Sequence, residues 1–150
     1  MTLKIIERRA LTVVGMQIRT RPMSAEIPAL WPKFVPRIDE IPNPAEPRVS
    51  YGVMRHDGGV LEYAAAISVT AAEGIPAGMV ALTLPAGAYA FFSYPLSGLG
   101  KGFGEIHNQL LPASTFEQRM GPFFERYDEE FDPRNPQSAV EIWIPVKPKD

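Results

Sequence analysis

The segment HDGGVLEYAAAISV (56–69) has the pattern of a β-hairpin. Asp57-Gly58-Gly59 favours a tight turn, because glycine readily adopts the positive φ angles that hairpin turns require. The residues before and after this turn alternate in hydrophobicity and favour strands. We therefore expect two antiparallel strands here, the first over 49–54 and the second over 60–69.

A second hairpin of the same kind is predicted near the end of the chain. Its strands would cover 123–127 and 140–146, on either side of the acidic, proline-containing loop DEEFDPRNPQS (128–138). In both hairpins a glutamate stands near the start of the second strand, so Glu62 and Glu141 would occupy equivalent places.

Each predicted hairpin is preceded by a strand and a helix. In the first half, the alternation over 9–19 predicts a strand with a bulge near Gly15. Apolar residues at three- and four-residue spacing over 24–38 predict a helix. Pro32 and Pro36 should kink or break this helix, because proline inside a helix removes a backbone hydrogen bond.

The second half repeats this order of elements. A strand over 89–94 precedes a predicted helix over 98–111, whose glycines should loosen its first turns. Residues 9–69 and 86–146 would thus be two strand-helix-hairpin modules, related by a pseudo-twofold axis, in one domain of 150 residues. The predicted fold class is α+β, an antiparallel sheet with the helices on one face and a cleft on the other.

Composition excludes several classes of function. Fifteen basic and 17 acidic residues give a formal net charge of -2, so we expect no direct binding to nucleic acid. There is no cysteine, which excludes disulfides and thiolate chemistry, and His56 and His107 do not form a metal-binding motif. We expect no cofactor and no metal. Charges interrupt the apolar runs at the N-terminus, so we expect a cytoplasmic protein without a membrane partner.

The segment FFERY (123–127) carries the most suggestive chemistry. Phe123, Glu125 and Tyr127 alternate onto one face of the predicted strand, which places a carboxylate between two aromatic rings. Glu141 and Trp143 should likewise lie on the face of their strand that points away from the helices. If these faces line a cleft, a desolvated carboxylate and nearby rings would attract an apolar amine. The alternative is that Glu125 pairs with a neighbouring arginine on the surface while the aromatic residues belong to an ordinary core.

Five short segments together resemble the GyrI-like, or AraC-type effector-binding, domains of bacterial regulators, and the likeness covers nearly the entire chain. They are YGV (51–53), LPAGAYAFFSY (84–94), QLLPAS (109–114), PFFERYD (122–128) and VEIWIPV (140–146). The resemblance implies a pseudo-twofold fold with a central pocket for a small lipophilic, often cationic, organic ligand. It implies ligand-binding roles for Glu125, Trp143, Tyr51, Phe92 and Tyr127.

The same resemblance leaves two other functions open. Some members of the superfamily are similar to hydrolases of reactive cyclopropane-containing compounds, and Glu125 would then be the catalytic general base. Others resemble gyrase inhibitors, which implies a protein partner for the aromatic strand face. Because Met1 stands close to the first predicted strand, we expect no helix-turn-helix domain before it. The glycine-rich segment GLGKGFG (98–104) fits no phosphate-binding spacing, and no serine nucleophile motif is present.

Overall fold

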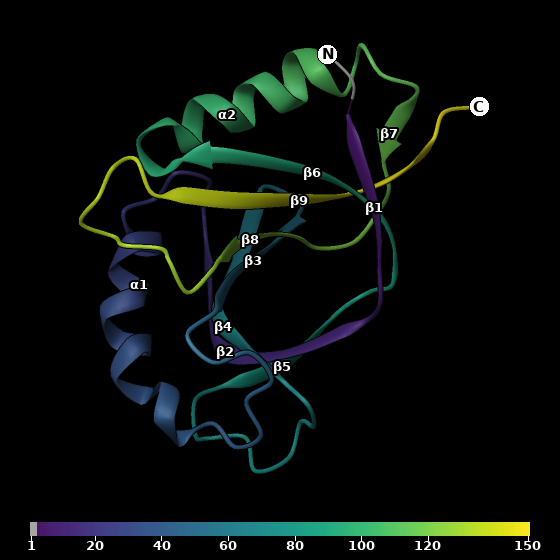
Figure 1. Cartoon of the computed structure of the whole chain (residues 1–150). Coiled ribbons are helices and arrows are strands. Elements are labelled where there is room, and N and C mark those ends of the chain that lie inside the picture. Colours follow the sequence, from purple (N-terminus) through teal and green to yellow (C-terminus); the bar gives the residue numbers. More distant parts are fainter. Residues whose placement is uncertain (1–2) are drawn as a thin grey trace.

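The structure, a computed structural model, describes residues 3–150 (Figure 1). The strands in this part of the chain are β1 (Lys4–Arg8), β2 (Leu11–Thr20), β3 (Ser50–Asp57), β4 (Val60–Val69), β5 (Val80–Leu84), β6 (Gly87–Pro95), β7 (Phe116–Gln118), β8 (Phe123–Tyr127) and β9 (Ala139–Pro148). The helices are α1 (Glu26–Phe34), which continues as the 3₁₀ helix η1 (Val35–Glu40), and α2 (Leu99–Glu105), which lies between the 3₁₀ turn η2 (Leu96–Gly98) and the π-helical η3 (Ile106–Leu110).

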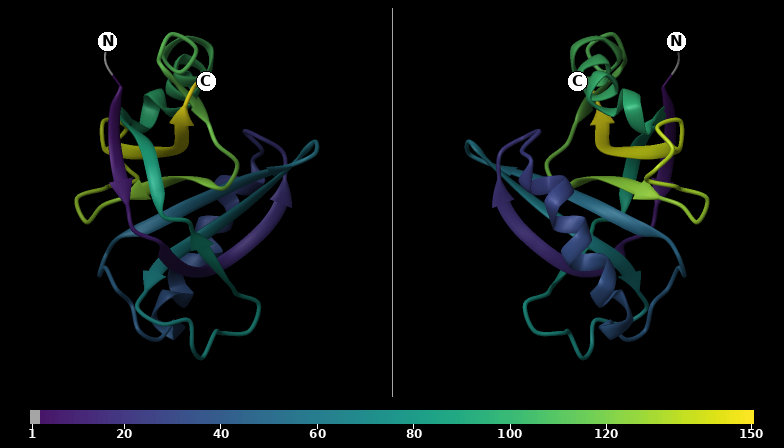
Figure 2. Two further views of the ribbon diagram at one scale, coloured as in Figure 1. Left: turned by 90° about the vertical axis from the view of Figure 1, so that its right-hand side faces the viewer. Right: turned by 90° about the vertical axis from the view of Figure 1, so that its left-hand side faces the viewer.

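The strands form one antiparallel sheet in the order β1-β6-β9-β8-β3-β4-β2-β5, and β7 pairs with the end of β9. Each half contributes the same succession, β2-α1-β3-β4 in the first and β6-α2-β8-β9 in the second. The halves meet where β3 pairs with β8, with Val53 opposite Phe124. The α+β class and the antiparallel sheet are confirmed, and the sheet curls strongly, as the bent β2 shows in Figure 2.

The hairpin predictions agree with the structure. Strands β4 and β8 have the predicted bounds, and Asp57 pairs with Val60 across Gly58 and Gly59. The positive φ of Gly58, 63°, explains why glycine is needed in this turn. Strands β1 and β7 were not predicted, because they are short and carry little alternation.

The predicted bulge near Gly15 is wrong. Strand β2 pairs with β4 in an unbroken register from Thr12 opposite Val69 to Thr20 opposite Leu61. Glycine is needed at this position for another reason. A Cβ atom on Gly15 would overlap the backbone carbonyl of Ala65, so the glycine permits a close approach of the two strands.

The prolines break the first helix as expected. Pro32 is accommodated inside α1, whereas the helix changes to 3₁₀ geometry at Val35, directly before Pro36. The second helix depends on Gly102, since a Cβ atom there would lie 2.7 Å from the ring of Tyr94 on β6. That glycine lets α2 approach the sheet closely.

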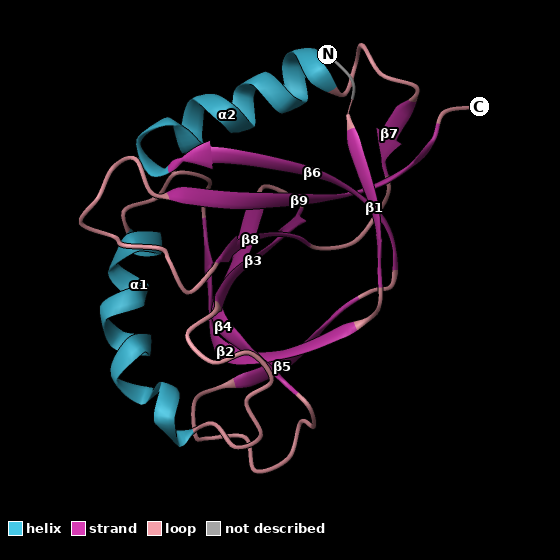
Figure 3. Ribbon diagram, in the orientation of Figure 1, coloured by secondary structure: helices cyan, strands magenta, loops and turns pink. Residues whose placement is uncertain are grey.

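Two hydrophobic cores lie on opposite faces of the sheet. The larger one contains Leu30 and Phe34 of α1 and Ile106 of η3, and Phe103 of α2 packs against it, so both helices cover the same face. The smaller core lies on the other face and contains buried aromatic residues but none from a helix. Figure 3 shows the helices as separate ribbons, each beside its own half of the sheet.

In the part of the chain that the structure describes, no helix has the length and apolar character needed to cross a membrane. Residues 3–150 also contain no cluster of three or more side chains able to hold a metal ion.

Candidate functional site

A cavity of about 820 Å³ lies between the beginnings of the two helices. Its floor is formed by inward-facing side chains of the central strands: Met54 and His56 from β3, Leu61 and Tyr63 from β4, and Phe123 and Glu125 from β8. One wall is formed by residues before and at the start of α1: Pro22, Met23, Ser24, Ala25, Ile27 and Pro28. The other wall is formed by the α2 region: Leu96, Ser97, Leu99, Gly100, Lys101, Phe103 and His107.

The cavity lies on the helix-covered face of the sheet, so the prediction of a cleft on the opposite face is wrong. The physical reason is the position of the helices. Helix α1 packs on β2 and β4, and α2 packs on β6, which leaves the middle of the sheet uncovered between them. Strands β3 and β8, where the two halves meet, lie in this middle part of the sheet.

Glu125 lies at the floor of this cavity with only 6% of its surface exposed. The hydroxyl of Tyr127 donates a hydrogen bond of 2.5 Å to its Oε1 atom. Gly52, opposite Glu125 on β3, leaves the space that this carboxylate occupies. A Cβ atom on Gly52 would lie 2.9 Å from Glu125 Oε1 and 2.5 Å from the hydroxyl oxygen of Tyr63. The glycine thus allows a tyrosine hydroxyl and a carboxylate to meet over the strand.

The indole of Trp31 contacts both tyrosines that lie beside the Glu125 carboxylate. The indole Nε1 of Trp31, on α1, donates a hydrogen bond of 3.0 Å to the hydroxyl of Tyr63. The ring of Trp31 also packs edge-on against Tyr127, at 5.4 Å between the ring centroids. Both phenols near Glu125 are therefore fixed by contact with the same indole.

Burial raises the pKa of Glu125 to about 7, although the hydrogen bonds from Tyr127 and Tyr63 oppose this rise. Within residues 3–150, Glu125 forms no ion pair. The alternative that Glu125 pairs with a neighbouring arginine on the surface is therefore wrong. When Glu125 is ionised, its carboxylate accepts a hydrogen bond from the hydroxyl of Tyr127.

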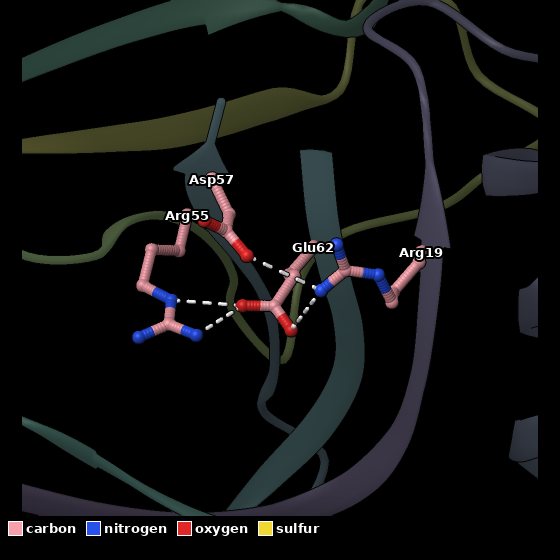
Figure 4. A network of polar contacts seen from close by, with 4 residues as sticks. All are labelled: Arg19, Arg55, Asp57 and Glu62. Carbon is pink, nitrogen blue, oxygen red and sulfur yellow. Dashed lines mark hydrogen bonds and ion pairs between the residues drawn. The ribbon is translucent and has the colours of Figure 1, made fainter. Parts of the chain in front are cut away.

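Other glutamates of the sheet have cationic partners. Glu62 on β4 accepts hydrogen bonds from Arg19 at 3.2 Å and from Arg55 Nε at 2.9 Å (Figure 4). Glu141, at the matching place on β9, accepts one from Arg126 at 3.2 Å. The predicted equivalence of Glu62 and Glu141 is thus reflected in a shared pairing, each with an arginine directly opposite on the neighbouring strand. Glu125 differs from both.

Of the residues predicted for the site, Glu125 and Tyr127 are brought together. Phe92 is partly buried against the core under the helices, but it does not line the cavity. Tyr51 and Trp143 belong to the core on the opposite face.

The register of the strands explains the separation of Trp143 from Glu125. Phe124 is opposite Trp143, whereas Glu125 is opposite Ile142, so the tryptophan and the carboxylate point to different faces. The expectation that they share a cleft is wrong. Trp143 instead stacks on Phe124 and donates a hydrogen bond of 3.0 Å to Glu141, with the guanidinium of Arg8 4.3 Å above its ring.

Tyr51 has a structural environment as well. Its hydroxyl donates a hydrogen bond of 2.6 Å to Glu46, which also accepts one from the buried Ser68. Burial, together with the nearby carboxylate of Glu46, raises the pKa of Tyr51 to about 12. This network joins the linker after η1 to the sheet and lies away from the cavity.

The sequence analysis missed several residues around the carboxylate, chiefly Trp31, Tyr63 and Gly52. A glycine inside a predicted strand often marks a close approach of other groups, and Gly52 in the YGV segment was such a signal. Tyr63 stands two residues after Leu61 in β4, and this spacing places both side chains on one face of the strand. No local pattern connects Trp31 to them, because that contact depends on how α1 packs.

Comparison with known proteins identifies the family. A family model described as a GyrI-like small molecule binding domain matches residues 1–147. The transcriptional regulator BrlR of Pseudomonas aeruginosa is 35% identical over 147 residues, which cover 95% of this chain and 54% of BrlR. The chain thus spans about half the length of that relative.

Solved structures show the same fold. SAV2435, bound to tetraphenylphosphonium, superposes with a TM-score of 0.78 at 21% identity, over 98% of this chain and 94% of that one. A putative transcription regulation protein of Staphylococcus aureus MU50 gives 0.73 at 20% identity, over 98% and 99%. A hydrolase of Listeria innocua gives 0.54 at 11% identity, over 97% and 91%. With the family model matching nearly its full length, this chain belongs to the GyrI-like small-molecule-binding domains.

Proposed function

We propose that this protein binds a lipophilic organic cation in the cavity between α1 and α2, with the ionised carboxylate of Glu125 as its counter-charge. The observation that carries this proposal is the state of Glu125. It is a buried carboxylate at the floor of a largely apolar cavity, without an ion-pair partner among residues 3–150.

The electrostatics of the site favour a cation over a neutral or anionic ligand. Burial holds the pKa of Glu125 at about 7, so removing its proton at neutral pH costs little free energy. An opposite charge within about 5 Å would contribute about 3 kcal/mol at the effective dielectric constant of about 20 that suits such sites. The ring of Phe123 beside it adds cation-π attraction of about 0.5–2 kcal/mol.

The cavity is suited to a ligand of this kind in size and lining. Its volume of about 820 Å³ lies within the usual range for small-molecule sites, about 300–1,000 Å³. Met54, Leu61 and Phe123 supply apolar surface around the carboxylate. A structural relative, SAV2435, has been solved with the lipophilic cation tetraphenylphosphonium, which supports the use of this cation as a probe.

Isothermal titration calorimetry at pH 8 tests the proposal, with tetraphenylphosphonium as the cation and tetraphenylborate as an anion of nearly the same shape. We expect binding of the cation and much weaker binding of the anion. Replacement of the carboxylate in Glu125→Gln should weaken cation binding by up to about 150-fold, which corresponds to the loss of the Coulomb attraction of about 3 kcal/mol estimated above.

The matched control is Glu117→Gln, which removes an exposed carboxylate of β7 that pairs loosely with Lys147 at 3.6 Å and lies outside the cavity. This variant should bind the cation as tightly as the wild type. Equal affinities of wild type and Glu125→Gln would contradict the proposal.

A hydrolytic function is the second candidate, and the pKa of Glu125 favours it. A carboxylate with a pKa of about 7, held by the hydroxyl of Tyr127, is well suited to accept a proton from water that attacks an electrophilic ligand. Incubation with strained cyclopropane electrophiles, followed by product analysis, tests this function. Product formation above the buffer rate that is lost in Glu125→Gln would support it, and a rate equal to buffer alone would exclude it for these compounds.

A further inference from the structure

The cavity is lined by an acidic side chain at its floor and by a lysine side chain in its wall. Glu125 is buried at the floor, on β8. Lys101 is exposed and belongs to the wall formed by α2. Within the described residues, neither side chain forms an ion pair within 4 Å. When Glu125 is ionised, the cavity therefore carries one unpaired negative charge and one unpaired positive charge.

The two walls differ in polarity. The wall at α1 contains no charged residue among those that line the cavity, and its polar member, Ser24, already accepts a hydrogen bond from the backbone of Glu26. The wall at α2 adds His107 to Lys101. The Nδ1 atom of His107 lies 3.0 Å from the carbonyl oxygen of Phe103, so its Nε2 atom is the one left for another partner.

We propose that the preferred ligand is a zwitterion, whose cationic centre lies at Glu125 and whose anionic group lies against Lys101 on the α2 wall. This inference rests on the proposed function and specifies the ligand class for the same site. A simple cation would pair with Glu125 and leave the charge of Lys101 without a partner. A ligand that carries both charges satisfies both side chains.

The two contributions should differ in size. Glu125 is buried, so its attraction for a cation is weakly screened. Lys101 is exposed, and an ion pair in such a place typically changes an affinity by about two- to fivefold. Lys101 would thus act as a specificity determinant, and Glu125 would supply most of the affinity.

A matched pair of phosphonium ions tests the inference: (4-carboxybenzyl)triphenylphosphonium and its methyl ester. At pH 8 the acid is a zwitterion and the ester is a cation of nearly the same shape. Calorimetric dissociation constants would be measured for the wild type, Lys101→Gln and Glu125→Gln. The control is Lys33→Gln, which removes an exposed lysine of α1 that does not line the cavity.

We expect the wild type to bind the zwitterion about two- to fivefold more tightly than the ester. Lys101→Gln should abolish this preference by weakening the binding of the zwitterion, while the ester binds equally well or better. Lys33→Gln should keep the wild-type preference.

The outcomes separate this inference from the proposed function. If the wild type prefers the ester, or if Lys101→Gln leaves the ratio of the two dissociation constants unchanged, the zwitterion inference fails while cation binding at Glu125 stands. If Glu125→Gln binds the ester as tightly as the wild type does, the proposed function fails. Absence of binding by both probes would overturn both proposals.

Discussion

Removal of the Glu125 charge should stabilise the ligand-free protein at alkaline pH. Burial raises the pKa of this carboxyl from its ordinary value of 4.5 to about 7, so the folded protein binds the proton more tightly than the unfolded chain does. The stabilisation from this proton is fully present below pH 4.5 and is lost as the pH rises through about 7. Above that pH the wild type must keep an ionised carboxylate in a buried place.

The size of the effect follows from the two pKa values. At about 1.4 kcal/mol for each pH unit, the difference between 4.5 and about 7 corresponds to about 3 kcal/mol in the free energy of unfolding. Glutamine has nearly the same shape and no charge, and its amide oxygen can still accept the hydrogen bond from Tyr127. Glu125→Gln should thus be more stable than the wild type by up to about 3 kcal/mol at pH 8.5 and by almost nothing at pH 4.5.

Urea unfolding followed by tryptophan fluorescence measures this difference at a series of pH values. Each comparison is made between variant and wild type at the same pH, so that the titration of all other groups cancels. Glu117→Gln serves as the control and should show no rise in stability with pH. If the stability of Glu125→Gln relative to the wild type were the same at pH 4.5 and pH 8.5, or fell as the pH rose, burial of an ionised Glu125 would not be the cause.

Three further predictions concern the same site. Affinity for tetraphenylphosphonium should fall about tenfold for each pH unit below 7, because a cation must then displace the proton from Glu125, and calorimetry of Glu125→Gln should show no such slope. Gly52→Ala should destabilise the fold by about 1–3 kcal/mol and weaken cation binding, since the new Cβ atom would crowd Tyr63 and Glu125; unchanged urea midpoints and affinities would contradict this. Trp143→Phe should lower the urea midpoint through the lost hydrogen bond to Glu141, yet change calorimetric cation affinity by less than about twofold. A large loss of affinity in that variant would contradict this and would indicate that Trp143 takes part in ligand binding.

Much of the fold could be predicted because its signals are local. The turn at Asp57-Gly58-Gly59 and the alternation in 60–69 determine a hairpin without reference to the rest of the chain. The same alternation placed Phe123 and Glu125 on one face of their strand, and both line the cavity. The prolines in the first helix also act locally, through the backbone bonds that they remove.

The remaining features depend on contacts between distant segments. Whether Trp143 faces Glu125 is decided by the pairing of β8 with β9, and a shift of that register by one residue would reverse the answer. Gly15 could be read as a bulge because a glycine in a strand fits either a bulge or a close approach, and the neighbour that decides between them, Ala65, is far away in the sequence. The face on which the cavity lies depends on where two helices pack, which no single segment determines.

The asymmetry of the cavity can be traced to one pair of equivalent positions. In the two hairpins, Arg55 is opposite Glu62 and Arg126 is opposite Glu141, so Arg55 and Arg126 occupy matching places. The residues directly before them, Met54 and Glu125, therefore match as well, and both line the cavity. The halves supply similar frames, but one presents a thioether and the other a carboxylate at the same place. Because these positions lie on opposite sides of the contact between β3 and β8, the floor of the cavity presents a carboxylate on only one side of that contact.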